Sequence, residues 1–435
     1  MNFLKLVRKY SFWGYDFLRG GQLKKHYLDV KFILENYGSK ESLSLREKYL
    51  RDLLEHAVKT SAYYKKTVVS SKFEDFPVIN KNTVLNNFED FKSSKYVNDA
   101  NTKVSTNGST GTPFKLFHNK NKRSRHDADN LYFAEKGGYS LGDRLYLLRA
   151  IHKKDFKSLL RFFRQNFKTF GILNYTDADI EKLLNDFKKG SSEKCIVCFA
   201  SMCEIIVNYL DSNNVVPMDN PVKSIVTDGD KLSKSTKDKM EKYFGIPVFA
   251  RYGNMECGVM GQQDKLSGHK YSLNWASYYF EVLDLKEDKP ANPGEVGRIV
   301  VTDLFNHCMP LIRYDTGDLA CFAKNEDKLI APCFERIEGR VVDLIWDTKG
   351  NVVSPYLIYC KMEDYGEELK QFQFAQKGSN DYVFRLNPWN TFTKEKDLLA
   401  DSKAYLGQDA NISIEYVKEV PLLSSGKRKP VINEM

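Results

Sequence analysis

The pattern of apolar and polar positions is most informative in the middle of the chain. Residues 222–227 are rich in β-branched side chains and predict a strand, and polar residues 228–230 predict a turn. A helix is expected from Ser233 to the glycine stop at Gly245, and residues 246–250 predict a second strand. A unit of this kind makes its two strands parallel, with a right-handed crossover.

The loops that follow these two strands are expected at one edge of the sheet. Parallel strands end at the same edge, where open α/β sheets bind their ligands. Asp230 follows the first strand and Glu256 follows the second. We therefore expect both carboxylates to face one crevice.

The flanking regions show other patterns. Apolar residues at positions 50, 53, 54, 57 and 58 predict an amphipathic helix, with a capping box over residues 44–47. After Gly297, short strands are expected at 298–302, 311–314 and 319–323. The segment beyond Gly339 predicts a small α+β domain, with strands at 371–374, 382–386 and 412–417 and a helix at 394–406.

Chain length also favours two domains, since 435 residues exceed what one hydrophobic core normally serves. We place the boundary near residues 340–343, giving a large domain over 1–340, helical over about 1–70, and a small domain over 341–435. The net charge of +9 comes from lysines scattered along the chain, which predicts no nucleic-acid partner. Eight cysteines, without the paired spacing of a small disulfide-linked scaffold, fit a reducing, cytoplasmic location.

The first 25 residues combine apolar and basic side chains without the uninterrupted apolar run of a signal peptide. Phe12, Trp13 and Phe17 lie among Lys5, Arg8, Lys9 and Arg19. This pattern fits an interfacial membrane helix. We favour the alternative, in which the segment packs on its own domain.

One loop, over residues 105–113, is rich in glycine and hydroxyl side chains. Glycine lets a backbone approach an anion closely, and hydroxyl and N–H groups donate to phosphate oxygens. The loop lacks the Gly-Lys-Ser/Thr end of a Walker A motif. By itself it is equally compatible with a solvated linker.

Four further motifs follow the loop in order, at residues 252–256, 313–318, 339–343 and 424–427. Each alone has a structural explanation, such as a surface carboxylate, a turn residue or an ion pair. Together, from about Leu50 onward, they resemble the acyl-adenylate-forming superfamily, and within it the phenylacetate-CoA ligase and CapK branch. The latter is associated with capsular polysaccharide synthesis. Residues 76–81 and 309–314 are also typical of that branch.

The resemblance implies an α/β fold similar to acyl-CoA synthetases. A large domain would have mixed and parallel sheets flanked by helices, and a small α+β domain would move as a lid. It further implies ATP and Mg²⁺ as cofactors. The implied ATP phosphate ligands are Thr106, Asn107, Gly108, Ser109, Thr110 and Gly111.

The resemblance also assigns the remaining site residues. Gly229 and Asp230 would lie at the adenine, and Tyr252, followed by Gly253, would stack on it. Glu256 would ligate Mg²⁺, a cation that prefers oxygen ligands. Asp318 would accept the ribose hydroxyls, and Arg340 would steady the nucleotide. The implied catalytic residues are Lys427, Glu256 and Arg340.

Lys427 would bridge the substrate carboxylate and the α-phosphate, because two approaching anions need a positioned cation. Its alternative explanation is a basic tail, Lys427–Lys429. Three residues depart from the family pattern. Met255 stands where a hydroxyl usually precedes the glutamate, Asn107 replaces a frequent serine, and Val342 occupies a usually polar hinge position.

Metal binding beyond Mg²⁺ is not predicted. Cys195 and Cys198 have zinc-like spacing but lie in an apolar strand, so we interpret them as core residues. Some relatives carry a cysteine/histidine metal cluster of which His269 and Cys333 would remain. Gln263 occupies a usual cysteine position, however, and no zinc is expected.

The leading functional hypothesis is a two-step ligase that forms acyl-AMP and then transfers the acyl group. The acceptor would be coenzyme A or an amine, as on a sugar, and the enzyme a monomer or homodimer. The acid pocket is expected around residues 199–204 and the Tyr252 loop. The alternative is a non-catalytic, nucleotide-binding scaffold for polysaccharide assembly, which Met255 favours.

Overall fold

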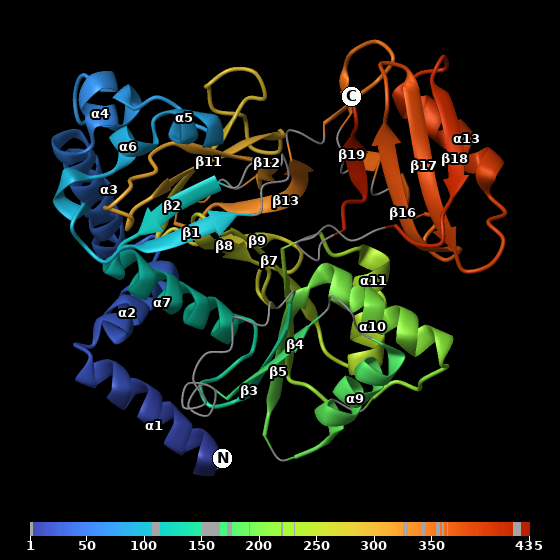
Figure 1. Cartoon of the computed structure of the whole chain (residues 1–435), viewed down its shortest axis with the longest axis horizontal. Coiled ribbons are helices and arrows are strands. Elements are labelled where there is room, and N and C mark those ends of the chain that lie inside the picture. The colour runs from blue at the N-terminus through green and yellow to red at the C-terminus, as the bar shows by residue number, and fades with distance from the viewer. Residues whose placement is uncertain are drawn as a thin grey trace. The chain divides into compact units, whose positions relative to one another are not determined.

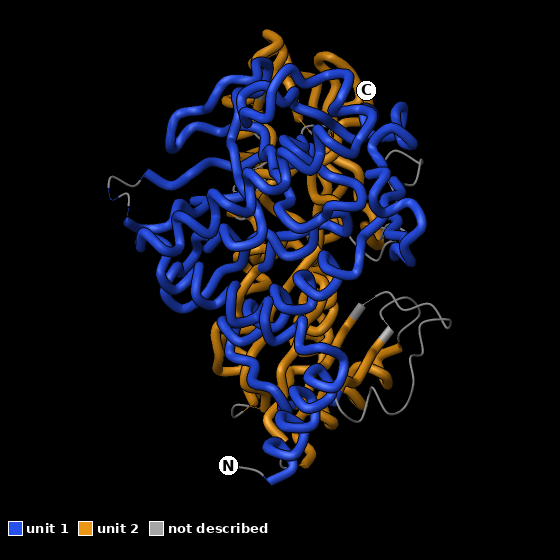
Figure 2. The backbone as a smooth tube through the Cα atoms, turned by 90° about the vertical axis from the view of Figure 1, so that its left-hand side faces the viewer, with its two compact units in different colours: residues 1–143, 160–166, 251–337 blue, residues 144–159, 167–250, 338–435 orange. Residues whose placement is uncertain are grey.

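The computed structural model covers the 435-residue chain. The structure describes every residue except 1–2, 107–113, 150–165, 172–175, 191, 219–220, 230, 325–326, 328, 341–343, 354–356, 359–360, 363 and 421–427. The chain forms two compact units (Figure 2). Unit 1 comprises residues 1–143, 160–166 and 251–337, and unit 2 comprises 144–159, 167–250 and 338–435.

Unit 1 combines N-terminal helices with mostly antiparallel strands (Figure 1). Its helical elements are α1 (Phe3–Leu18), α2 (Gln22–Glu35), α3 (Lys40–Thr60), α4 (Ala62–Thr67), η1 (Phe73–Asp75), α5 (Lys81–Asn86), α6 (Phe88–Phe91), η2 (Ser94–Tyr96) and α7 (Lys120–Lys136). Its strands are β1 (Thr102–Thr106), β2 (Phe114–His118), the second half of β7 (Val248–Asn254), β8 (Gly258–Gln262), β9 (Tyr271–Leu273), β10 (Tyr278–Leu283), β11 (Gly297–Asp303), β12 (Tyr314–Phe322) and most of β13 (Cys333–Arg340). Within the sheet the order is β10-β11-β12-β13-β9-β8, and β1 and β2 form a separate hairpin.

Unit 2 begins with a parallel sheet of order β4-β3-β5-β6-β7. Its elements are β3 (Arg144–Arg149), β4 (Phe167–Gly171), α9 (Asp177–Lys188), β5 (Lys194–Phe199), α10 (Ala200–Ser212), β6 (Ser224–Asp228), α11 (Lys234–Phe244) and the first half of β7. Apolar side chains from the sheet and from α9, α10 and α11 form one buried cluster. The strands are buried because helices cover them, as parallel strands require.

The C-terminal part of unit 2 has its own core. It contains β14 (Ile345–Trp346), β15 (Val352–Val353), β16 (Leu369–Gln376), β17 (Asp381–Pro388), α13 (Glu395–Leu406), β18 (Asn411–Tyr416) and β19 (Val431–Asn433). Four of these strands form a sheet of order β18-β17-β16-β19. Three strands and the helix match their predicted positions within a few residues.

The predicted strand–helix–strand unit at the centre of the chain is confirmed. β6 and β7 pair in parallel, with Ile225 opposite Val248. The side chain of Ser233 caps α11 by accepting from the backbone N–H of Thr236, and Gly245 ends the helix with a φ of 69°. The α/β class, with parallel and mixed strands flanked by helices, is likewise confirmed.

Two local predictions are wrong. The third helix begins at Lys40, not near Ser44, because Ser39 caps it by accepting from the N–H of Ser42. Residues 311–313 are not a strand, since Arg313 has a φ of 51°, which an extended strand does not allow. One strand, β12, then runs through residues 314–322, where a separate strand was expected at 319–323.

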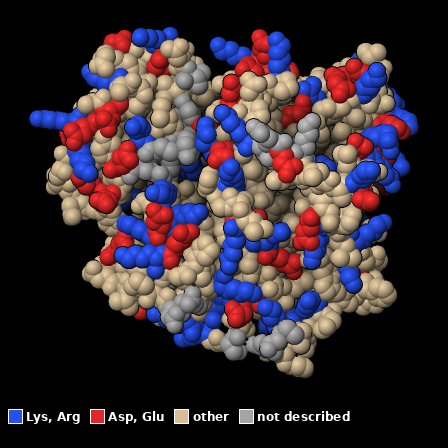
Figure 3. All heavy atoms as spheres, turned by 180° about the vertical axis from the view of Figure 1, so that it is seen from behind, with Lys and Arg blue, Asp and Glu red and all other residues tan. Residues whose placement is uncertain are grey.

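The surface carries both signs of charge. Basic and acidic side chains are interspersed over the face seen in Figure 3, without a continuous basic stripe. Among the described helices, none has the length and apolar character that crossing a bilayer would require. Cys195 and Cys198 are buried in β5, as the core interpretation predicted.

Candidate active site

The structure brings Tyr252 and Asp318 together in unit 1. Tyr252 lies in β7 and Asp318 in β12, and the tyrosine hydroxyl donates to Asp318 Oδ2 at 2.9 Å. Tyr252 is buried, and its pKa is raised well above the usual value by burial and by the Asp318 charge. The hydroxyl therefore stays protonated and keeps one oxygen of the carboxylate oriented.

The part of β12 around Asp318, where the pairing with β11 shifts register, is held by its own motif. The backbone N–H of Asp318 donates to Thr316 Oγ1 at 3.1 Å, and Thr316 Oγ1 donates to the Ile299 carbonyl at 3.0 Å. Gly317 has a φ of 76°, a conformation that glycine adopts without strain. These local bonds explain why the motif at residues 313–318 needs a threonine and a glycine next to the aspartate.

Glu256 lies in the turn that follows β7 and is buried. Asn254 Oδ1 accepts from the N–H of Cys257 at 2.8 Å and closes the turn. The Tyr314 hydroxyl donates to Glu256 Oε1 at 3.2 Å. The ring of His118 contacts the Glu256 carbonyl through Nε2 at 2.8 Å, and burial lowers the pKa of His118 to about 4. His118 is thus neutral near pH 7.

Gly253 allows a close approach between β7 and β8, the two strands that flank this turn. A Cβ on Gly253 would collide with the backbone carbonyl of Gly258. The pairing of β7 and β8 shifts register between Tyr252 and Gly253, as in a β-bulge. The glycine thus shapes the turn that carries Glu256.

The predicted phosphate loop connects β1 and β2, in which Thr106 pairs with Phe114. Asn107, Gly108, Ser109, Thr110 and Gly111 lie outside the described residues, as does the side chain of Thr106. Phe114, at the exit of the loop, stacks on Tyr314, with ring centroids 6.1 Å apart and planes 8° apart. Tyr314 in turn contacts Glu256, so the loop exit and the acidic turn share one aromatic neighbour.

A buried polar network supports the Glu256 turn. Lys122 and Asp303 form a fully buried ion pair, with Nζ and Oδ2 2.5 Å apart. Lys122 Nζ also donates to the Tyr278 hydroxyl, which donates to the carbonyl of Cys257. Sequence reasoning missed these residues, because lone charges far apart along the chain carry no local signal. It also missed Tyr314, although that residue stands inside a motif already identified.

The other predicted site residues belong to unit 2. Gly229 directly follows β6 and has a φ of 89°. Asp230 and Lys427 lie outside the described residues, as do Val342 and the side chain of Arg340. The predicted shared crevice for Asp230 and Glu256 therefore stays a prediction.

Arg428, the residue after Lys427, is anchored within unit 2. Its guanidinium donates to Glu204 Oε2 on α10 at 2.6 Å, to Glu419 Oε1 at 2.9 Å and to the Val420 carbonyl at 2.6 Å. Burial raises the pKa of Glu204, while the charge of Arg428 lowers it. Arg428 also lines a cavity of about 110 Å³ together with Ala200, Ser201 and Glu204. These three residues belong to the segment 199–204, which was predicted to shape the acid pocket.

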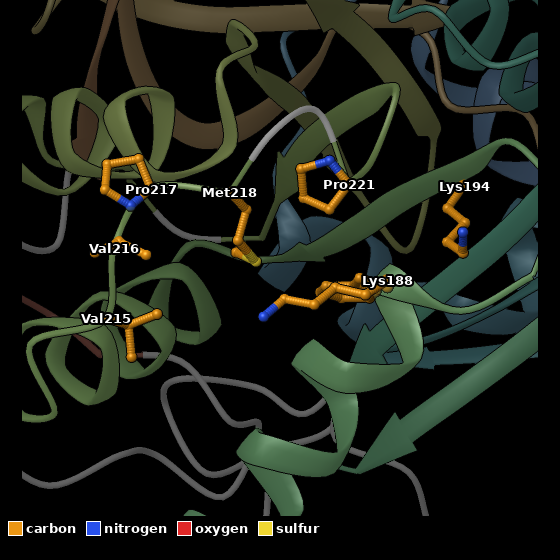
Figure 4. Close-up of a pocket in the computed structure, with 8 residues that line it drawn as sticks. Lys188, Lys194, Val215, Val216, Pro217, Met218 and Pro221 are labelled. Atoms are coloured by element: carbon orange, nitrogen blue, oxygen red, sulfur yellow. The ribbon is translucent and has the colours of Figure 1, made fainter.

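A larger cavity in unit 2, of about 480 Å³, lies elsewhere (Figure 4). Lys188, Lys194, Val215, Val216, Pro217, Met218 and Pro221 surround it. Lys194 begins β5 and the others precede β5 or β6, so the cavity is at the amino ends of these strands. Ligands of open α/β sheets bind at the carboxyl ends. This cavity is therefore a poor candidate for the active site.

The residues at the positions of the relatives' cysteine/histidine metal cluster make other contacts in this chain. His269 Nε2 lies 2.9 Å from Glu335 Oε1, and Gln263 Nε2 donates to the His269 carbonyl at 2.7 Å. Cys333 is half-buried at the start of β13, and burial raises the pKa of its thiol. The expectation that no zinc binds here stays a prediction.

Comparison with solved structures defines the class of fold. A 2-hydroxyisobutyryl-CoA ligase in the postadenylation state, in complex with 2-HIB-AMP, has a TM-score of 0.70 at 16% identity, covering 89% of this chain and 88% of that one. An anthranilate CoA ligase in complex with anthranoyl-AMP has a TM-score of 0.52 at 14% identity, covering 75% and 65%. The chain has the fold of these acyl-CoA ligases, as the resemblance implied.

Sequence comparison is more specific. Protein CapK of Staphylococcus aureus is 22% identical over 98% of this chain and 96% of its own length. Residues 345–434 match the CapK C-terminal domain family. Phenylacetate-coenzyme A ligase of Thermus thermophilus is 24% identical over 32% of this chain and 30% of that protein. The predicted resemblance to the phenylacetate-CoA ligase and CapK branch is confirmed.

Proposed function

We propose that this chain activates a carboxylic acid with ATP, forming acyl-AMP and pyrophosphate, and then transfers the acyl group to coenzyme A or an amine. One observation carries the proposal. Glu256 and Asp318, the residues predicted for Mg²⁺ and ribose, are each oriented by a tyrosine hydroxyl within one unit. The fold of acyl-CoA ligases that hold acyl-AMP is consistent with this assignment.

ATP would bind through groups suited to each of its parts. Asp318, with one oxygen held by Tyr252, presents a carboxylate as acceptor for ribose hydroxyls. The loop at residues 106–111 would donate N–H and hydroxyl groups to the phosphates. Gly229, Asp230 and Gly253 would border the adenine with Tyr252.

Glu256 fits a magnesium ligand. Its carboxylate is a hard oxygen donor, and Mg²⁺ binds through one or two carboxylates plus substrate phosphates. When bound, the ion would neutralise charge on the phosphates.

In the first step, a carboxylate oxygen of the acid attacks the α-phosphorus. The bond from this phosphorus to the bridging oxygen breaks, and pyrophosphate leaves with the electron pair. Lys427 would place its ammonium between the two anions, and Arg340 would hold the nucleotide. A cation in that position stabilises the charge that develops in the transition state.

Arg428 supports this role for Lys427. Three acceptors hold its guanidinium, so the chain is fixed immediately after the lysine. Glu204, one of these acceptors, lies near the start of α10, whose first residue follows β5. The carboxyl end of β5 is the edge where ligands of such sheets bind.

In the second step, a thiol or amine attacks the acyl carbon, AMP leaves with the bonding electrons, and the nucleophile loses its proton. The solved relatives are CoA ligases, which favours a thiol. Similarity to CapK, whose branch is associated with capsular polysaccharide, favours an amine on a sugar. Parallel transfer assays with coenzyme A and with amino sugars would decide between these acceptors.

The proposal is tested by acid-dependent exchange of labelled pyrophosphate into ATP across a panel of carboxylic acids. We expect exchange with at least one acid, and its loss in Asp318→Asn. Asp211→Asn is a matched control, because Asp211 also accepts from a tyrosine hydroxyl and lies in unit 2 on α10. ATP binding without exchange for any acid would instead favour the scaffold alternative, which the exposed Met255 leaves open.

A further inference from the structure

Helix α1 presents a stripe of large apolar side chains to water. Residues 3, 7, 10, 14 and 17 recur at helical spacing and form one stripe. Phe3, Tyr10 and Phe17 are 76%, 70% and 79% exposed. Leu18, at the end of the helix, is 83% exposed, and no residue of α1 is buried. Surface helices normally show the reverse arrangement.

The opposite face explains why the helix adopts this orientation. Lys5 Nζ lies 2.5 Å from Asp143 Oδ1, and the Asp143 side chain is fully buried. The backbone N–H of Ser140 also donates to Asp143 Oδ2 at 2.9 Å, and Lys5 adds the opposite charge that this buried carboxylate needs. The backbone of Lys5 also lies close to Gly142, where a Cβ would approach the Lys5 carbonyl to 2.5 Å.

The other end of the helix is fixed by Asp16. Its carboxylate oxygens accept from the N–H groups of Leu23 and Lys24 at 3.1 and 2.9 Å, which caps the start of α2. Trp13 packs against Tyr27 of α2, with ring centroids 5.6 Å apart. Two charged contacts and one aromatic contact therefore hold α1 with its apolar stripe outward.

Exposed basic residues accompany the apolar stripe on α1 and at the start of α2. Lys9 and Arg19 are exposed on and just after α1, and Lys24 and Lys25 are exposed at the start of α2. Arg19 donates to the Tyr15 hydroxyl at 3.0 Å. Asp16 is the single acidic residue in the sequence up to Leu28, and its carboxylate is occupied by the α2 N-terminus.

We propose that α1 lies in the interface of an anionic lipid bilayer, with its Phe3–Leu18 apolar stripe among the acyl chains. Aromatic and aliphatic side chains exposed on one face, together with exposed lysine and arginine, are features of interfacial helices. These cations match a negatively charged surface, which adds electrostatic attraction to apolar burial. The helix would thereby hold the enzyme at a membrane, independently of which acid it activates.

The test is co-sedimentation of the full chain with vesicles of phosphatidylcholine, with and without phosphatidylglycerol. We expect binding to the anionic vesicles, weakened by salt. The double variant Phe17→Ser/Leu18→Ser should bind at least about tenfold less, because it removes two large apolar side chains from the interface. Lys24→Glu and Lys25→Glu should each weaken binding about fivefold.

The matched control is Val69→Ser/Leu266→Ser, which removes two apolar side chains that are 99% and 91% exposed elsewhere in unit 1. It should bind as the wild type does. Absence of binding to anionic vesicles, or equal loss in both double variants, would overturn the proposal. Equal binding to neutral and anionic vesicles would overturn the assignment to anionic lipid. A dimer that forms without lipid and dissociates in Phe17→Ser/Leu18→Ser would assign the stripe to a second copy.

Discussion

Tyrosine hydroxyls orient both carboxylates of the candidate site. Tyr252 contacts Asp318, and Tyr314 contacts Glu256. For both tyrosines the pKa is raised well above its usual value, mainly by burial. A protonated hydroxyl beside each carboxylate restricts its rotation without adding a charge that would compete with a metal or a ligand.

Tyr252→Phe should therefore weaken nucleotide binding more than it disturbs the fold. One hydrogen bond to a charged group is worth about 1.5–3 kcal/mol, so we expect the KM for ATP to rise about tenfold. Tyr243→Phe is the control, because it removes a 2.6 Å hydrogen bond to Asp211 away from the site. Similar ATP affinity in the two variants would contradict the role given to Tyr252.

His118 should make stability depend on pH. Burial lowers its pKa from 6.5 to about 4, so the unfolded chain binds its proton more readily than the folded one. Stability is then fully present above about pH 6.5 and is lost as the pH falls toward 4, by roughly 1 kcal/mol per unit. His118→Gln keeps a donor for the Glu256 carbonyl but does not titrate. Urea unfolding at several pH values should show a shallower slope for this variant, and an unchanged slope would contradict the argument.

At the scale of elements, local signals predicted some units and failed for others. The unit β6–α11–β7 was predictable, because Ser233 and Gly245 mark the helix ends and β-branched residues mark the strands. The start of α3 was not, since Ser39 and Ser44 are equally plausible caps by sequence. The strand break at Arg313 depends on contacts from elsewhere, including a bidentate pair with Glu281.

The β7–β8 turn should depend strongly on glycine. Gly253→Ala places a Cβ against the Gly258 carbonyl, and backbone atoms cannot move aside cheaply. We expect a loss of about 2 kcal/mol or more in the free energy of unfolding, with weaker ATP binding. Gly14→Ala, where nothing lies within 4 Å of the new Cβ, should be neutral or slightly stabilising. A stable, fully active Gly253→Ala variant would contradict the argument.

At the scale of the whole molecule, the site depends on pairs of residues that no local sequence pattern predicts. The motifs identified Glu256 and Asp318, but not Tyr314, Lys122 or Asp303. The fold class followed from the family resemblance, and most C-terminal strands followed from periodicity, because each of these segments carries its own apolar pattern. The ion pair between Lys122 and Asp303 did not, because charged residues are usually exposed and only the fold buries these two.

The contact between Arg428 and Glu204 joins distant parts of unit 2. Arg428→Ala removes the cation from the half-buried Glu204, so we expect slower adenylation and a loss of about 2 kcal/mol in stability. The double variant Arg428→Ala/Glu204→Gln removes both charges and should recover much of the stability but not the adenylation rate. Full recovery of the rate would show that Arg428 has a structural role alone.

The most direct test of the account is capture of the acyl-adenylate itself. The enzyme is incubated with ATP, Mg²⁺ and a metabolite mixture, and acyl-AMP is identified by mass spectrometry. We expect one or a few acyl-adenylates from the wild type and a near-complete loss in Lys427→Ala, which should still transfer from supplied acyl-AMP. No acyl-AMP despite ATP binding, or equal amounts from Lys427→Ala, would contradict it.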